Sequence, residues 1–138
     1  MQLPQARQER LIIEESANEL LVYDQARDRV HCLNPSAAFV WRHCDGRTDI
    51  KQMALLMHKE FNTAANEDLV SLALQQLHRK DLLAAGWRPQ TAGPKISRRE
   101  LARRLGLAIA LVPLISSILA PTPLMATTPV DGLDGRPC

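Results

Sequence analysis

Aromatic residues are scarce in this 138-residue chain, where they make up 4% of the sequence. Proteins that stack nucleic-acid bases need several aromatic side chains on one surface, so this scarcity argues against that class of binder. Positive charge is limited too, because the net charge of +2 combines a balance of +3 in residues 95–138 with −1 in the residues before them. The larger part of the chain therefore lacks the basic surface that binding to DNA or RNA needs.

Cysteine is also sparse, and the three cysteines Cys32, Cys44 and Cys138 make no paired disulfide framework. The first residues contain no charged segment followed by an apolar segment, so we expect no secretory signal there. We therefore expect free thiols, a reducing compartment and a cytoplasmic protein.

Motifs for catalysis or cofactor binding are missing as well. The sequence has no spacing typical of a nucleophile, base and orienting group, and no glycine-rich phosphate loop, so we expect no catalytic residues and no cofactor. The pairs His31-Cys32 and His43-Cys44 suggest zinc, but structural zinc sites use short Cys-x-x-Cys or His-x-x-x-His units. Neighbouring strand residues also point to opposite faces, so we expect no metal site and interpret Cys32 and Cys44 as small core residues.

One internal boundary is visible, because two glycines and two prolines lie within residues 86–94. We expect a recognition domain over residues 1–86, a linker over 87–94 and, over 95–138, a basic segment followed by a hydrophobic tail. The composition, with 46% hydrophobic and 23% charged residues, suits one modest core.

Three short strands are expected at the start of the domain, over residues 11–13, 19–24 and 29–33. Short turns separate them, which predicts antiparallel neighbours in a meander. Three strands alone are not stable in water, so they need a layer of helices.

Three helices are expected to supply that layer. Asn34 is a helix N-cap followed by Pro35 at the first helical position, Thr48 or Asp49 caps a second helix, and Asn66 caps a third. Each helix carries an apolar stripe at helical spacing, formed by Ala37, Val40, Trp41 and Cys44, by Ile50, Met53, Ala54, Met57 and Phe61, and by Val70, Ala73, Leu74 and Leu77. The predicted fold is therefore α+β, a three-stranded antiparallel meander followed by a three-helix bundle of winged helix-turn-helix type, with a hydrophobic C-terminal tail.

A second ridge on the third helix is the first hint of function. Leu69, Leu72 and Gln76 lie at i, i+3 and i+7 beside the core stripe, which indicates either a helix buried on two sides or one wall of a peptide groove. The strand over 29–33 would be an edge of the meander, and an open edge binds extended peptides through its main chain. The candidate peptide-binding residues are Arg29, Val30, His31, Cys32, Leu33, Leu69, Leu72 and Gln76.

Residues 10–83 resemble the PqqD family, the precursor-recognition domain of pathways that modify ribosomally made peptides. The resemblance rests on four motifs in order, which are Leu20-Leu21-Val22-Tyr23-Asp24, Leu33-Asn34-Pro35-Ser36-Ala37-Ala38 followed by Trp41, Cys44-Asp45-Gly46-Arg47-Thr48, and Leu77-His78-Arg79-Lys80-Asp81-Leu82-Leu83. It implies a peptide chaperone without catalysis. Such a chaperone holds the leader of a precursor as a strand added to the third strand, against the third helix, and presents it to a modifying enzyme. In pyrroloquinoline quinone (PQQ) biosynthesis this enzyme is a radical-SAM enzyme.

A membrane-tethered winged-helix DNA-binding regulator is the alternative. A recognition helix contacts bases through its N-terminal residues. Here those residues would be Asn66, Glu67 and Asp68, which bring negative charge to phosphate, so we expect no nucleic-acid partner.

The tail combines a basic run with a long uncharged run. Residues 95–104 carry five positive charges and one negative, and residues 105–130 carry none. We expect a helix that ends near Ala120, and about 24 Å of helix over residues 105–120 is shorter than a bilayer core of about 30 Å. This predicts a short membrane tail or amphiphilic anchor, with the basic flank at the inner face of the membrane.

A second interpretation of the tail is a signal-like or precursor-like segment fused to its own recognition domain. Ser97-Arg98-Arg99-Glu100-Leu101 resembles a twin-arginine export motif. If the tail is precursor-like, Thr127, Thr128 and Cys138 are positions for modification.

Overall fold

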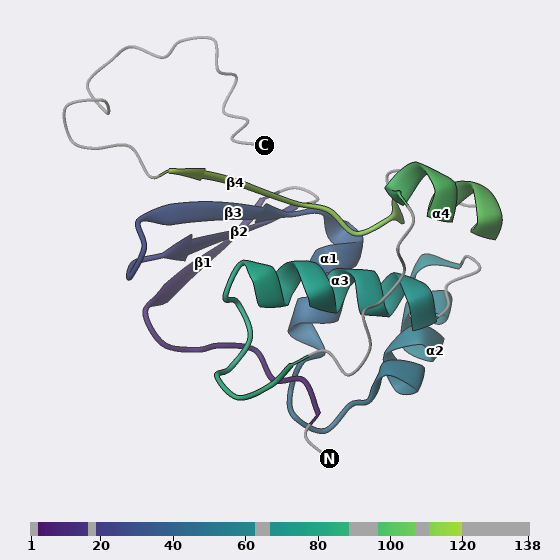
Figure 1. Ribbon diagram of the computed structural model, residues 1–138, viewed down its shortest axis with the longest axis horizontal. Helices are drawn as coiled ribbons and strands as arrows, with labels where there is room; N and C mark the ends of the chain where they lie inside the picture. Colours follow the sequence, from purple (N-terminus) through teal and green to yellow (C-terminus); the bar gives the residue numbers. More distant parts are fainter. Residues whose placement is uncertain (1–2, 17–18, 63–66, 89–96, 107–110, 120–138) are drawn as a thin grey trace, which may run out of the picture.

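The protein has an α+β fold in a computed structural model that describes residues 3–16, 19–62, 67–88, 97–106 and 111–119. These residues form a four-stranded antiparallel sheet and four helices (Figure 1). The predicted α+β class is confirmed. The winged helix-turn-helix likeness stays a prediction.

The sheet consists of β1 (Leu11–Ser16), β2 (Glu19–Asp24), β3 (Arg29–Leu33) and β4 (Ile115–Leu119). Its strand order is β1-β2-β3-β4, and all neighbours are antiparallel. The first three strands form the expected meander, in which Leu20 lies opposite Leu33. The fourth strand was not predicted, and it comes from the tail.

The four helices are α1 (Pro35–Arg42), α2 (Ile50–Phe61), α3 (Glu67–Arg79) and α4 (Arg98–Leu105). The Asn34 side chain accepts a hydrogen bond from the Ala37 N–H at the start of α1, as predicted. Asp49, the second of the two predicted candidates, caps α2 in a capping box with Gln52. Asn66, the predicted cap of the third helix, lies outside the described residues.

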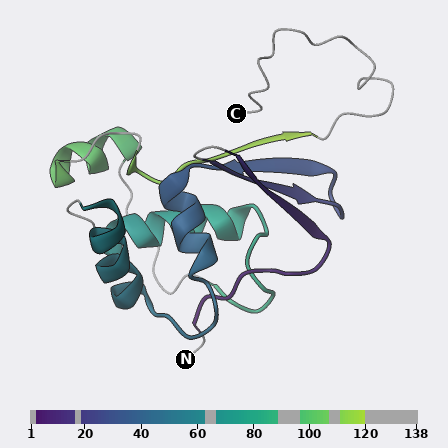
Figure 2. The same cartoon turned by 180° about the vertical axis from the view of Figure 1, so that it is seen from behind.

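Helices α1 and α3 cover one face of the sheet, and α2 packs against both of them (Figures 1 and 2). The core is built from the alternating side chains of β2 and from the predicted helical stripes. Leu20, Val22, Val40, Leu74 and Leu77 each expose 1% or less of their surface. Burying a side chain of this size stabilises the fold by roughly 1.5–3 kcal/mol, so these residues hold the sheet against the helices.

Backbone hydrogen bonds from the residues before β1 join the segment after α1 to the segment after α3. The Ala6 N–H donates to the Cys44 carbonyl at 2.7 Å, and the Arg7 N–H donates to the Leu82 carbonyl at 2.9 Å. Gly46 has a φ of +78°, a conformation that favours glycine, and its N–H donates to Pro4. Two of the four family-like motifs therefore meet at the N-terminal segment.

The tail folds differently from the sequence-based expectation. Helix α4 ends at Leu105, and Gly106 follows it with a left-handed φ of +67°. The chain then returns to the sheet as β4, so the expected helix to Ala120 is wrong. No helix within the described parts of the chain is long and apolar enough to cross a membrane. Leu101, Ala102, Val112 and Ile115 of this segment join the same hydrophobic core as the domain.

Candidate peptide-binding site

Strand β4 lies on the edge of β3, which is the edge predicted to receive a peptide. Leu33 is opposite Ile115, His31 is opposite Ser117, and Arg29 is opposite Leu119. The chain itself thus shows what a strand added at this position looks like (Figure 1). The expectation of an open edge at residues 29–33 is wrong, because residues 115–119 cover it.

The first contact row of the site is apolar. Residues directly opposite each other in an antiparallel pair project from the same face. Leu20, Leu33 and Ile115 form such a row on the face that the helices cover, with 1%, 0% and 6% of their surfaces exposed. The added strand therefore inserts Ile115 into the core of the domain.

The second contact row is polar and buried. His31 is 1% exposed, and its Nδ1 lies 2.7 Å from the Ser117 hydroxyl. Burial lowers the pKa of His31, and the positive charge of Lys80 lowers it further. The imidazole is therefore neutral at pH 7, and it forms a hydrogen bond with the Ser117 hydroxyl of β4.

Three side chains hold the bend that leads into β4. Asn34 donates to the Val112 carbonyl at 2.9 Å and accepts from the Leu114 N–H at 3.1 Å. Gln76 on α3 donates to the Pro113 carbonyl at 2.8 Å and accepts from the Ile115 N–H at 2.9 Å.

Arg98 on α4 is the third side chain that binds the bend. Its guanidinium donates to the Val112 carbonyl at 2.7 Å and to the Pro113 carbonyl at 3.0 Å. Burial lowers the pKa of Arg98, so the charge is held in a partly desolvated place where these carbonyls replace water. The bend is therefore recognised through its main chain, because every one of these bonds goes to a backbone group.

All five predicted residues of β3 pair with β4, and Gln76 bonds to the bend that leads into it. They differ in burial, because His31, Cys32 and Leu33 are buried, whereas Val30 is half-buried and Arg29 is exposed.

The two leucines of the predicted ridge on α3 differ in how deeply they are buried. Leu69 exposes only 1% of its surface and belongs to the hydrophobic core, whereas Leu72 is partly buried and packs against that core. A role for either residue in binding a peptide stays a prediction.

Two residues that bind the bend were missed by the sequence analysis. Asn34 was assigned only as a helix cap, yet its side-chain oxygen accepts from both Ala37 and Leu114. Arg98 was interpreted as part of an export-like motif. In the structure Ser97 caps α4, and Arg98 points at the carbonyls of the bend. A polar residue that already has a local role gives no sequence signal for a second, long-range role.

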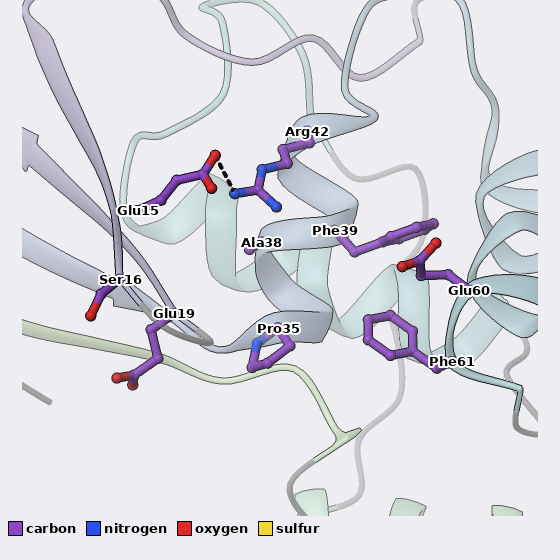
Figure 3. A pocket seen from close by; sticks show the side chains of 9 residues that line it. All are labelled: Glu15, Ser16, Glu19, Pro35, Ala38, Phe39, Arg42, Glu60 and Phe61. Atoms are coloured by element: carbon purple, nitrogen blue, oxygen red, sulfur yellow. Dashed lines mark ion pairs between the residues drawn. The ribbon is translucent and has the colours of Figure 1, made fainter.

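A hollow lies beside α1, between β1 and α2 (Figure 3). Arg42 and Glu15 form an ion pair at 3.0 Å across it, and Phe39 meets Phe61 edge-on with ring centroids 5.6 Å apart. Nine residues line this hollow: Glu15, Ser16, Glu19, Pro35, Ala38, Phe39, Arg42, Glu60 and Phe61. It is acidic, and none of its lining residues belongs to β3 or β4, so it supplies a spatial control for the β3 site.

The cysteines and histidines do not assemble a metal centre in the part of the chain that the structure describes. Cys44 is a free thiol that donates to the Val40 carbonyl, and burial raises its pKa to about 12. A thiol with this pKa is a core residue and not a nucleophile at pH 7. Cys32 is disulfide-bonded in the structure, so the expectation of a free thiol is wrong at that position.

The comparison with protein families agrees with the resemblance deduced from the sequence. Residues 19–83 match the model of the family described as coenzyme PQQ synthesis protein D (PqqD). The match covers just under half of the chain and runs from β2 to the residues after α3. Searches of the curated proteins and of the solved structures found no match. The recognised part therefore contains β3 and α3, while α4 and β4 lie outside it.

Proposed function

We propose that this protein is a peptide chaperone without catalytic activity. It holds the leader of a ribosomally made precursor as a strand added to β3 and presents the precursor to a modifying enzyme, for example a radical-SAM enzyme. The family match over residues 19–83 supports a role in peptide recognition. The observation that carries the proposal is β4 itself, an extended segment seated on β3 with its approach bound by Gln76 of α3.

The geometry suits an extended, uncharged ligand. Strand addition gives affinity through main-chain hydrogen bonds, and pockets for alternate side chains give selectivity. Here the pocket side chains are Ile115 against Leu33 and Ser117 against His31. A charged side chain at the Ile115 position would be buried without a partner, which is strongly unfavourable.

The two acidic residues at the N-terminus of α3 argue against the DNA-binding alternative. Glu67 and Asp68 are exposed in the first turn of this helix, where a recognition helix would meet the bases. Peptide recognition uses the opposite part of the same helix, around Gln76.

The proposal is tested by opening the site and offering a peptide in its place. In the variant Ile115→Asp a carboxylate would have to enter the core, so residues 115–119 are expected to leave β3. A fluorescein-labelled peptide with the sequence of residues 111–119, made soluble by two added lysines, should then bind this variant in a polarisation titration.

The site control is the double variant Ile115→Asp/Gln76→Ala, which lacks both hydrogen bonds from Gln76 to the bend and should bind the same peptide roughly 10- to 30-fold more weakly. A folded Ile115→Asp protein that ignores the peptide would contradict the proposed function.

A further inference from the structure

We propose that the ligand of the β3–α3 site is residues 111–119 of the same chain, held in cis, so that the protein carries its own leader. This inference rests on the proposed function, since it names the peptide that the site holds. Strand β4 could instead be a permanent fourth strand of the fold, and the two alternatives differ in whether the site remains a folded, empty receptor once β4 leaves.

The contacts at the bend have the character of ligand recognition. Asn34, Gln76 and Arg98 come from three different elements and converge on the carbonyls and N–H groups of residues 112–115. None of these bonds lies in the strand ladder, so a fourth strand needs none of them. Pro113 has no N–H and therefore leaves no donor unsatisfied at the point where the chain is most enclosed.

The apolar contacts also divide between receptor and ligand. Leu20, Val22 and Leu33 of the sheet belong to one core cluster with buried residues of α1 and α3, and α1 contacts both β2 and β3. The segment adds few buried side chains of its own, chiefly Val112 at 0% and Ile115 at 6% exposure. Removal of the segment would uncover one strand edge and leave the rest of the core in place.

Covalent attachment gives this segment a large advantage over any free peptide. A ligand joined to its site through the same chain has an effective concentration on the order of millimolar. A free peptide of equal intrinsic affinity, with a dissociation constant of about 10 µM, then binds about 100-fold more weakly to the intact chain. A separate precursor therefore has to displace β4, and the resting protein presents the polypeptide that follows Leu119, which is its own residues 120–138.

The experiment compares three full-length proteins with the labelled 111–119 peptide described above. Wild type and Ile118→Asp keep β4 seated, because Ile118 is 44% exposed and a charge there stays in water. Ile115→Asp, on the core-facing side of the same strand, releases it. We expect the peptide to bind Ile115→Asp at least 100-fold more tightly than it binds the other two proteins, and we expect all three to sediment as monomers.

Each other outcome identifies which claim has failed. Equal binding to wild type and Ile115→Asp overturns self-occupancy and leaves peptide recognition standing. No binding to a folded Ile115→Asp protein overturns both claims. A wild-type dimer whose copies exchange β4 overturns the cis arrangement.

If Ile115→Asp does not fold, hydrogen exchange of the wild-type protein distinguishes a self-bound ligand from a permanent fourth strand. A self-bound ligand opens locally, so the amides of β4 should exchange at least 10-fold faster than those of β1, the other edge strand of the same sheet. Exchange of β4 at the same rate as β1 would make β4 a structural strand and overturn the inference.

Discussion

The imidazole of His31 and the hydroxyl of Ser117 lie 2.7 Å apart in adjacent strands, although 85 residues separate them in the chain. This pair joins the most buried polar side chain of β3 to the segment that occupies its edge. The His31 Nε2 is buried and has no hydrogen-bond partner in the structure. A proton added to this ring would therefore be buried without an acceptor.

The first prediction is that acid loosens β4. Burial lowers the pKa of His31 while β4 is seated, whereas an open site restores it toward 6.5. The seated state is therefore fully favoured above pH 6.5 and loses stability as the pH falls through that value. Hydrogen exchange of residues 115–119, corrected for its intrinsic pH dependence, should rise up to about 10-fold between pH 7.5 and 5.5.

The control for this effect is His31→Asn, which keeps a hydrogen-bonding group at the site but does not titrate. Its corrected exchange should be flat over the same range. A pH response of equal size in this variant would assign the effect to groups other than His31.

The second prediction concerns Gln76, whose side chain makes two bonds to the bend. Each such bond contributes about 1 kcal/mol, so Gln76→Ala should raise the opening of β4 by roughly 10- to 30-fold. Gln76→Glu keeps an acceptor for the Ile115 N–H but loses the donor to Pro113, and its effect should be intermediate. Exchange mass spectrometry of residues 111–119 measures both, and wild-type rates in Gln76→Ala would remove α3 from the site.

The third prediction separates the two neighbouring arginines of the export-like motif. Arg98 donates to the carbonyls of Val112 and Pro113, whereas Arg99 is exposed. Arg98→Ala should weaken the seating of the tail by about 2 kcal/mol, because hydrogen bonds from a charged group are the stronger ones. Arg99→Ala is the matched control and should leave proteolysis of the tail unchanged. Equal effects of the two changes would mean that charge alone matters.

The fourth prediction concerns stability away from the site. Burial raises the pKa of the Asp24 carboxyl, but hydrogen bonds from Arg7 and from the Ala26 N–H outweigh this effect, and the pKa is about 2. A lowered pKa stabilises the folded protein above the unfolded value near 3.9, and this stability disappears as the pH falls toward 2.

Urea denaturation tests this ion pair. Asp24→Asn should lower the free energy of unfolding by about 2 kcal/mol at pH 7 and by about half as much at pH 3. The control is Asp28→Asn, an exposed carboxylate in the adjacent turn. A loss for Asp24→Asn that does not change with pH would show that packing, and not ionisation, is responsible.

Local patterns in the sequence were sufficient for most of the domain. Short apolar runs separated by turn residues predicted β2 and β3. Capping predicted the start of α1 at Asn34, and it predicted the start of α2 at Thr48 or Asp49, of which Asp49 is the cap. The apolar stripes matched the buried residues because a helix of this size has one face toward its sheet.

The same reasoning did not predict the fold of the tail, and the cause is physical. An uncharged run of this kind is equally compatible with a helix, a strand or a membrane segment, and only a partner decides. The partner of residues 115–119 is β3, more than 80 residues earlier in the chain. Gly106 and Pro113 break the helix, but nothing local indicates which edge receives the strand that follows.

The most direct test of strand addition is hydrogen exchange of β3 in Ile115→Asp, measured by NMR before and after the 111–119 peptide is added. The account predicts that amides within residues 29–33 lose protection in the variant and regain it when the peptide binds, while β1 is unaffected. If the peptide binds without protecting β3, or protects the residues around Phe39 and Arg42 in the hollow of Figure 3, peptide recognition by strand addition to β3 is wrong.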